Sequence, residues 1–353
     1  MYRLILAIIL LIPALSAQAQ TSLLGDRFFR YSEEIPEDFL SSKAFALVHI
    51  DHASGTPRPN WKSEVSKLQE GLAKLGVDVA ASFYREDFMA GSRTIFDNAL
   101  MMRKRKMNKV IFFGKDQSGY TLIYTDFNRK RSLTDQGQNA FKIKGTALDV
   151  MFERLEDKIR RGAIKRNNLL VMSEPEYFPP KPFTTSKDKL QQKYTANLNS
   201  GKLAIPNIVS LELPEGANST DPGLASDVRN ENQRLKTEEE ALKQLWTKYP
   251  YEYGFVDYDK LKEDDYRKQG YRFVILCLKG SESTIRTHLN WQEKTVRGKK
   301  PKKVDYGTKT VYKFYVKHIL TQRIFTGDKW DGASTKTEAL NNFLSNLLKP
   351  LER

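Results

Sequence analysis

Two histidines and an aspartate stand at the end of an apolar stretch, and they form the one cluster with the character of metal ligands. On a strand, His49 and Asp51 share a face, and His52 follows at the strand's end. Imidazole and carboxylate groups bind divalent metals and also act as general acids and bases. Adjacent histidines at a strand end also occur in ordinary structural or solvated positions. The sequence leaves two readings open, a metal site serving a hydrolase and a purely structural role.

A second group of residues has the chemistry to bind anions. Residues 297–303 read RGKKPKK, and residues 103–106 read RKRK. The basic side chains of the first run are Arg297, Lys299, Lys300, Lys302 and Lys303. Such runs contact phosphates, but the sequence favours a solvated loop for the first run and a helix C-terminus for the second. If an anion binds, we expect it at residues 297–303.

Two further patterns have a structural alternative. Tyr251, Tyr253 and Phe255 alternate along a predicted strand, as a packed strand or an aromatic binding platform would. Residues 327–338 place glycine and glutamate where a calcium loop has them, but Gly327 and Lys329 cannot supply the first ligands. We therefore predict a turn that caps the last helix.

Common catalytic signatures are missing from the chain. It contains no phosphate-binding glycine loop, dinucleotide fingerprint, serine-hydrolase elbow or zinc-protease motif. Cys277 is its one cysteine and lies in an apolar run, which favours a buried thiol over a reactive one. No cofactor is predicted. An enzyme is not excluded, but these common routes are.

The first residues predict export. Residues 1–19 carry Arg3, an apolar run and small residues at Ala17 and Ala19, the pattern of a cleaved signal peptide. The chain has 353 residues and a formal net charge of +15. That length favours two or more domains, and that charge fits anionic partners such as glycans, lipid headgroups or nucleic acid. We expect a periplasmic or extracellular protein.

Hydrophobic periodicity predicts the same order of elements twice. Residues 43–50, 77–84 and 109–128 read as strands, the last a hairpin, and residues 61–75 have the periodicity of an amphipathic helix. Asp87 is expected to cap a second helix, and residues 169–172 to add a strand.

The second half begins with a strand at residues 203–213, where Pro206 argues for an edge or a bulge. A long helix is expected at about residues 227–248. Residues 271–291 resemble the first hairpin, and residues 310–325 read as one long, bent strand. Both halves thus read β-α-β-α-β-β-(β)-α, which predicts an α+β fold of two tandem mixed-sheet modules. We place the first module at residues 20–173, a proline-rich linker at 174–202 and the second module at 203–353.

The phrases LQEGLAKLGVDVAASF, NKVIFFG and ALDVMFERLEDKI carry a resemblance. They resemble the small exported modules of the TolB N-terminal, CsgG and LpoB type, and KQLWTKYPYEYGFVDY, YRFVILCLKG and EALNNFLSNLL follow the same order. The resemblance implies a non-catalytic adaptor or assembly role in the bacterial envelope, with a protein partner. It supplies no catalytic residues, and the lipid anchor of many such proteins is missing here.

These observations lead to three hypotheses. The first is a non-catalytic exported binding or assembly adaptor. The second is an anionic polymer binder that uses the basic loops. The third is a metal-dependent hydrolase at His49, Asp51 and His52.

Overall fold

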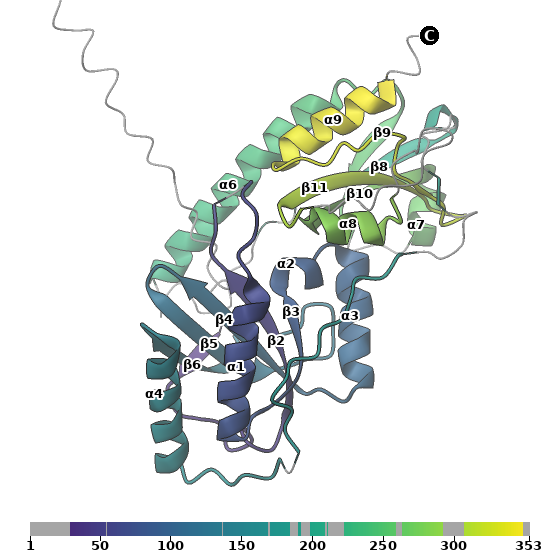
Figure 1. Ribbon diagram of the computed structural model, residues 1–353. Coiled ribbons are helices and arrows are strands. Elements are labelled where there is room, and N and C mark those ends of the chain that lie inside the picture. Colours follow the sequence, from purple (N-terminus) through teal and green to yellow (C-terminus); the bar gives the residue numbers. More distant parts are fainter. Residues whose placement is uncertain are drawn as a thin grey trace, which may run out of the picture.

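The chain forms two modules built on separate sheets, seen one above the other in the computed structural model (Figure 1). The described residues are 29–53, 55–135, 137–168, 170–183, 190–191, 198–208, 210, 222–258, 263–291 and 307–348. The predicted signal peptide and the basic run at residues 297–303 lie outside them.

The first sheet has six strands in the order β1-β6-β5-β4-β2-β3. β2 lies between β3 and β4 and is parallel to both, whereas β5 is antiparallel to β4 and to β6. β1 is parallel to β6 at the far edge. The strand bounds are β1 Arg30–Ser32, β2 Lys43–Ile50, β3 Asp78–Tyr84, β4 Lys109–Asp116, β5 Gly119–Asp126 and β6 Asn139–Gly145.

Helices cover both faces of this sheet. α1 (Trp61–Leu75) and α4 (Leu148–Arg161) pack on one face, and α2 (Arg85–Phe88) and α3 (Ser92–Lys104) on the other. α1 buries Val65, Leu68 and Leu72, whose spacing of three and four residues places them on one side of a helix. It ends at Gly76, which has a φ of 89° and donates its N–H to the carbonyl of Ala73.

The second sheet repeats the first in strand order and orientation. Its order is β7-β12-β11-β10-β8-β9. The pairs β7–β12, β10–β8 and β8–β9 are parallel, and the pairs β10–β11 and β11–β12 are antiparallel. The bounds are β7 Leu190–Gln191, β8 Lys202–Pro206, β9 Tyr253–Val256, β10 Tyr271–Ser281, β11 Thr310–His318 and β12 Ile324–Phe325. The predicted duplication and the α+β class of two mixed-sheet modules are confirmed.

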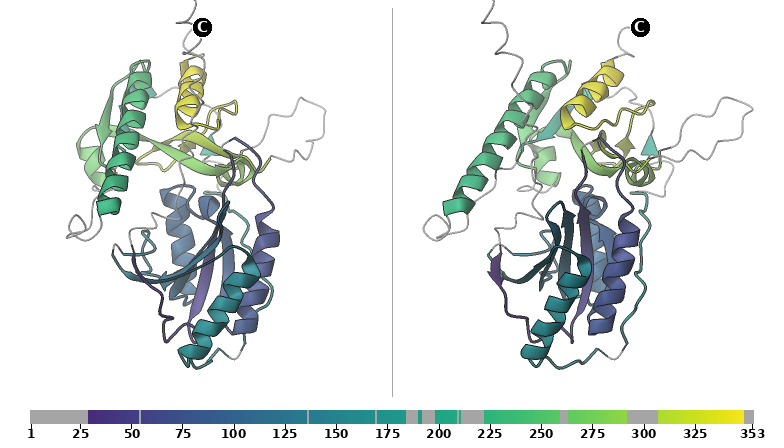
Figure 2. Two further views of the ribbon diagram at one scale, coloured as in Figure 1. Left: turned by 90° about the vertical axis from the view of Figure 1, so that its left-hand side faces the viewer. Right: turned by 60° about the vertical axis from the view of Figure 1, so that its left-hand side comes forward.

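Helices of the second module follow the same plan. α6 (Pro222–Trp246) and α9 (Lys336–Leu348) lie together over one face of the sheet, as Figure 2 shows. α7 (Glu263–Lys268) and α8 (Glu282–His288) pack on the other face. The predicted turn before α9 is also present, because Thr335 Oγ1 accepts a hydrogen bond from the Glu338 N–H.

The largest difference from the sequence prediction is α8, where residues 282–291 were expected to form the second hairpin strand. Ser281 caps this helix by accepting from the Thr284 N–H, and Glu282 pairs with Arg286 one turn later. The strand that returns beside β10 is β11 instead, with Ser281 opposite Thr310. The predicted single strand at residues 310–325 is two strands, β11 and β12.

Three smaller predictions were wrong. Asp87 lies inside α2 and does not cap α3, which begins at Ser92. Pro206 lies at neither an edge nor a bulge, because β8 is between β10 and β9 and Pro206 is its last residue, beyond the ladder with β10. Residues 170–172 form no strand. The Met172 carbonyl instead accepts a hydrogen bond from Gln69 Nε2 of α1, at 2.7 Å.

The first part of the predicted linker is held against the first module. We call residues 173–183 the strap. The Glu176 carbonyl accepts the Ser82 N–H of β3 at 3.0 Å, and Tyr177 forms a parallel bridge with Ser82. Phe178 stacks on Phe83 with ring centroids 5.5 Å apart. The strap thus closes the outer edge of the first sheet.

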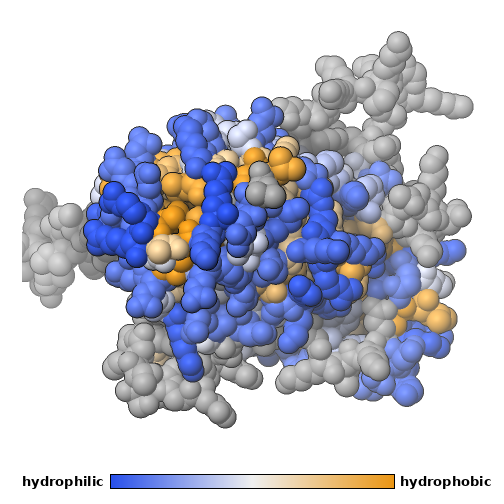
Figure 3. All heavy atoms as spheres, turned by 90° about the horizontal axis from the view of Figure 1, so that it is seen from below, coloured by the Kyte–Doolittle hydropathy of each residue, from blue (hydrophilic) through white to orange (hydrophobic). Residues whose placement is uncertain are grey.

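The lower end of the first module exposes apolar side chains. Residues 162–168 and 170–172 lie at this end, where Leu170 is 90% exposed and Met172 64%. Viewed from below, hydrophobic surface is gathered between charged side chains (Figure 3). Apolar side chains exposed on one face are typical of contact sites. Within the described ranges, the structure contains no helix of the length and apolar character that a bilayer crossing requires.

Candidate functional site at the junction of the modules

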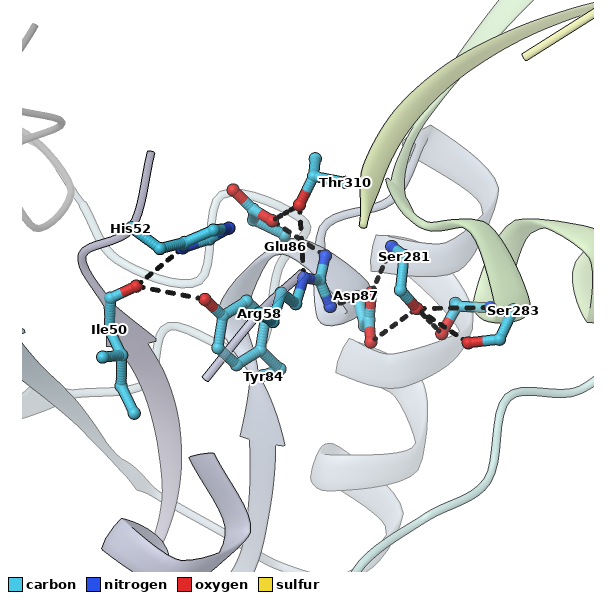
Figure 4. A network of polar contacts seen from close by, with 10 residues as sticks. Ile50, His52, Arg58, Tyr84, Glu86, Asp87, Ser281, Ser283 and Thr310 are labelled. Carbon is cyan, nitrogen blue, oxygen red and sulfur yellow. Dashed lines mark hydrogen bonds and ion pairs between the residues drawn. The ribbon is translucent and has the colours of Figure 1, made fainter. Parts of the chain in front are cut away.

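A group of charged and polar side chains lies where α2 of the first module meets β10 and β11 of the second. Figure 4 shows side chains from both modules pointing toward one another at this place. Arg58 comes from the loop before α1, where Pro57 and Pro59 restrict the backbone on either side. Glu86 and Asp87 are adjacent in α2, directly after β3. Thus three charged groups meet at the end of one module.

Arg58 binds both carboxylates at once. Its Nη2 donates to Glu86 Oε2 at 2.8 Å, and its Nη1 pairs with Asp87 Oδ1 at 2.8 Å. Its Nε donates to Thr310 Oγ1 of the second module at 3.2 Å, and the guanidinium lies 4.2 Å from the Tyr84 ring centroid. The Arg58 side chain is only 2% exposed. A buried guanidinium with this many partners fixes geometry and is costly to remove.

The two carboxylates also reach across the junction. Thr310 Oγ1 donates to Glu86 Oε2 at 2.6 Å, and the Ser281 N–H donates to Asp87 Oδ1 at 2.9 Å. Beside them, the Lys279 N–H donates to the Ala90 carbonyl at 2.9 Å. A side chain at Gly91 would meet Leu278, because a Cβ there would lie 2.6 Å from its Cδ2 atom. The backbones therefore approach closely, and each module completes the hydrogen bonding of the other.

The strap adds a second connection between the two modules, through α8 of the second. The Phe183 N–H donates to the His288 carbonyl at 2.8 Å, and His288 Nδ1 donates to the Lys181 carbonyl at 2.8 Å. The Phe183 and His288 rings stack with centroids 4.9 Å apart. The strap is therefore attached to both β3 and α8.

The chemistry of this junction is that of a fixed contact. Burial would raise the pKa of Glu86, but the Arg58 charge and the Thr310 hydrogen bond outweigh burial and hold that pKa below its ordinary value. A carboxylate kept ionised and fully engaged is a poor general acid. Ser281 Oγ contacts Asp87, Ser283 and Thr284, and none of these partners is a histidine that could activate it.

The three residues of the predicted metal site lie beside this junction but do not converge. In the described part of the chain, no three His, Cys, Asp or Glu side chains come close enough together to hold a metal ion. His52 Nδ1 donates to the Ile50 carbonyl at 3.0 Å, the same oxygen that accepts from the Tyr84 hydroxyl at 3.3 Å. Asp51 is exposed. The cluster does not have the geometry of a metal centre.

His49 is the residue of this cluster with an unusual environment. It is buried, and among the described residues neither ring nitrogen has a hydrogen-bond partner. Burial, followed by the Arg85 charge, lowers the pKa of His49 to about 4. The imidazole is therefore neutral at neutral pH.

This environment predicts acid sensitivity. Because the folded pKa lies below the unfolded value, the unfolded chain binds the extra proton between about pH 6.5 and pH 4. The native state should lose about 3 kcal/mol of stability from this group as the pH falls through that window. Replacing His49→Phe should remove that part of the loss. Urea unfolding from pH 7 to pH 4.5 measures it, and a pH slope equal to that of the wild type would contradict the assignment.

Of the two basic runs in the sequence, one lies among the described residues. Residues 297–303 lie outside the described ranges. Arg103 and Lys104 are the last residues of α3, Arg105 and Lys106 follow it, and all four are exposed. Arg105 pairs with Glu176 of the strap at 2.6 Å and lies 4.8 Å from the ring centroid of Phe178. Arg105 is therefore a structural contact, whereas Arg103, Lys104 and Lys106 face solvent.

An open groove of about 890 Å³ lies on the first module between α1, α4 and the turn of the β4–β5 hairpin. At the floor of the groove α1 and α4 pack closely, because a Cβ on Gly71 of α1 would lie 2.2 Å from the Phe152 ring of α4. Its rim carries Lys67 and Lys74 beside Glu153 and Glu156. Such a mixture of charges favours a contact surface over a site for one small ligand.

The aromatic strand is packed in part. Tyr253 contacts Tyr249 and Trp246 with ring centroids 6.0 and 6.3 Å apart, whereas Phe255 is 36% exposed. The predicted packed strand therefore describes its first half, and Phe255 leaves an apolar surface at the edge of the sheet.

Cys277 is half-buried in β10, and burial raises the pKa of its thiol to about 12. Because this pKa lies far above pH 8, the thiolate fraction at pH 8 should be small. The thiolate and not the thiol is the nucleophile, so the native thiol should react slowly. We expect the native protein to react with a disulfide reagent about 100-fold more slowly than the urea-unfolded chain. Equal rates in the two states would contradict the assigned environment.

The chain was also compared with known proteins. No protein-family model, curated protein or solved structure matches it.

The sequence analysis did not identify the junction residues, although one feature of the sequence indicates where they lie. Glu86 and Asp87 are paired carboxylates directly after a buried strand, where a buried counter-charge is expected. Their partners Arg58, Ser281 and Thr310 could not be assigned, because they lie up to 252 residues apart in the chain.

Proposed function

We propose that this protein is a non-catalytic adaptor of the bacterial envelope, exported and then bound to a protein partner. The observation that carries the proposal is the junction, where Arg58, Glu86 and Asp87 bind one another and also bind groups of the second module. Two modules in a fixed relation present a defined surface, which suits recognition. The apolar lower end of the first module adds an area that a partner would cover.

Affinity capture from the producing organism's envelope fraction tests this proposal. The bait is the full chain without residues 1–19, and Arg58→Ala in the same chain is the comparison. We expect a protein partner in stoichiometric amount on the wild-type bait and less of it on the variant. Recovery of no protein by the wild-type bait would overturn the adaptor function.

A second candidate function is favoured by the exposed basic run. Arg103, Lys104 and Lys106 face solvent, and the chain carries a net charge of +15. An anionic polymer held by such residues must lose affinity steeply with salt, because binding releases counterions. Binding to heparin or single-stranded DNA between 50 and 300 mM salt decides this, and a flat response would exclude it.

A further inference from the structure

The outer edge of the second sheet is open at β9. Among the described strands, β9 is hydrogen-bonded to β8 alone. The Leu203 N–H donates to the Glu252 carbonyl at 3.0 Å, and the Asn207 N–H donates to the Val256 carbonyl at 2.9 Å. Because backbone groups alternate in direction along a strand, the N–H and C=O groups of Tyr253 and Phe255 point away from β8. Within the described ranges, no backbone group is bonded to this side.

The same edge of the first module is closed by the chain itself. β3 is the counterpart of β9 in the repeated strand order. The strap runs parallel to β3, and its Glu176 carbonyl accepts the Ser82 N–H at 3.0 Å. Tyr177 of the strap packs edge-on against Trp61 of α1, with ring centroids 5.5 Å apart. One module therefore shows what the edge of this fold accepts, namely an extended segment with an aromatic side chain.

The open edge has matching side chains. Phe255 is 36% exposed at β9, on the side of the sheet that α6 covers. Lys243 of α6 lies over the Phe255 ring, with Nζ 5.2 Å from the centroid. Tyr253 and Phe255 contact each other edge-on at 5.9 Å. An aromatic side chain arriving at this edge would find an apolar ring beside unpaired backbone donors and acceptors.

We propose that β9 is the docking site for an extended segment of a protein partner, which adds to the second sheet as a parallel strand. Its backbone would bond to Tyr253 and Phe255, and an aromatic side chain would pack on the Phe255 ring as Tyr177 packs on Trp61. Backbone bonds supply affinity and the aromatic contact supplies selectivity, as in other strand-addition complexes. This proposal rests on the proposed adaptor function and names the chemistry of the partner.

Hydrogen exchange with a peptide probe tests the site. The probe is a synthetic peptide with the strap sequence SEPEYFPPK, added in excess to the full chain without residues 1–19. Without the probe, the amides of Tyr253 and Phe255 should exchange faster than those of Gly254 and Val256. With the probe, we expect the Phe255 amide to slow at least about 10-fold, since opening of a new hydrogen bond then limits exchange.

Two matched variants separate the contributions. Phe255→Pro removes the outward N–H and the ring, and proline is tolerated where a strand's N–H faces outward. Phe255→Ala removes only the ring. We expect Phe255→Pro to abolish the protection and Phe255→Ala to weaken binding without abolishing it. Near-equal binding by wild type and Phe255→Pro, or protection at Ser82 in place of Phe255, would overturn the site. Self-association through β9 in the probe-free protein would also overturn it, since a second copy would then be the occupant.

The capture experiment separates this inference from the proposed function. If wild type retains its partner and Phe255→Pro loses it, both stand. If both baits retain the partner, the adaptor function stands and the β9 site fails. If neither bait retains a protein, both fail. Native circular dichroism of Phe255→Pro establishes that a loss of binding is not a loss of fold.

Discussion

Replacing Arg58→Ala is expected to destabilise the protein by about 3 kcal/mol and to separate the unfolding of its two modules. The change leaves Glu86 and Asp87 without their shared counter-charge at a place where water reaches them poorly. It also removes the bond from Arg58 to Thr310 of the second module. Removing one member of a buried ion pair costs several kcal/mol, chiefly because the other charge stays buried.

The four tryptophans make this result measurable module by module. Trp61 lies in the first module, and Trp246, Trp291 and Trp330 lie in the second. Fluorescence of variants that keep only Trp61 or only Trp246 reports each module during denaturation. We expect coincident midpoints with Arg58 present and separated midpoints in Arg58→Ala.

Arg93→Ala is the matched control for this prediction. The Arg93–Asp97 pair is also at 2.8 Å, but it lies exposed on α3. Its loss should change stability by no more than about 0.5 kcal/mol. If Arg58→Ala behaves like Arg93→Ala, the junction does not hold the modules together.

Replacing Lys313→Met should have an effect as large, confined to the second module. Lys313 and Asp331 are fully buried, with Nζ 2.5 Å from Asp331 Oδ1. Nζ also donates to the carbonyls of Phe314 and Thr326 at 2.7 and 2.9 Å. Removing the ammonium leaves a buried carboxylate that still accepts a hydrogen bond from Asn346, at 3.3 Å, but has lost its counter-charge. We expect a loss of about 3–5 kcal/mol.

The double variant K313M/D331N distinguishes an unpaired charge from lost packing. An amide at position 331 can still accept from Asn346, so neutralising both partners should recover most of the loss. Arg267→Met is the exposed control, because its pair with Asp264 lies in solvent. Urea unfolding followed at Trp246 measures all three variants. If the double variant is no more stable than Lys313→Met, the uncompensated charge is not the cause of the lost stability. If Lys313→Met does not fold at all, the predicted recovery is seen as restored folding of the double variant.

Most of the fold could be predicted because its elements depend on local patterns. The periodicity of Val65, Leu68 and Leu72 predicts α1, and the apolar alternation of β4 and β5 predicts the first hairpin. α8 was missed because its seven residues are amphipathic only in their tertiary context, where Ile285 is buried under β10 and β11. Pro206 was misplaced because its interior position depends on where β10 stops pairing with β8.

The candidate site could be predicted far less. A cluster such as His49, Asp51 and His52 is visible because its members are adjacent in sequence, yet the fold does not bring them together. Arg58, Glu86 and Thr310 meet only because two duplicated modules pack end to end. Contacts of this kind depend on the arrangement of whole modules, which hydrophobic periodicity does not encode.

A distance measurement between the two modules tests the central claim, that the Arg58 junction holds them as one unit. Spin labels would be placed at Lys74→Cys on α1 and Lys268→Cys on α7, both exposed, in a chain with Cys277→Ala. Pulsed electron resonance should give one narrow distance distribution, which broadens when Arg58→Ala is added. A broad distribution with Arg58 present would contradict the account.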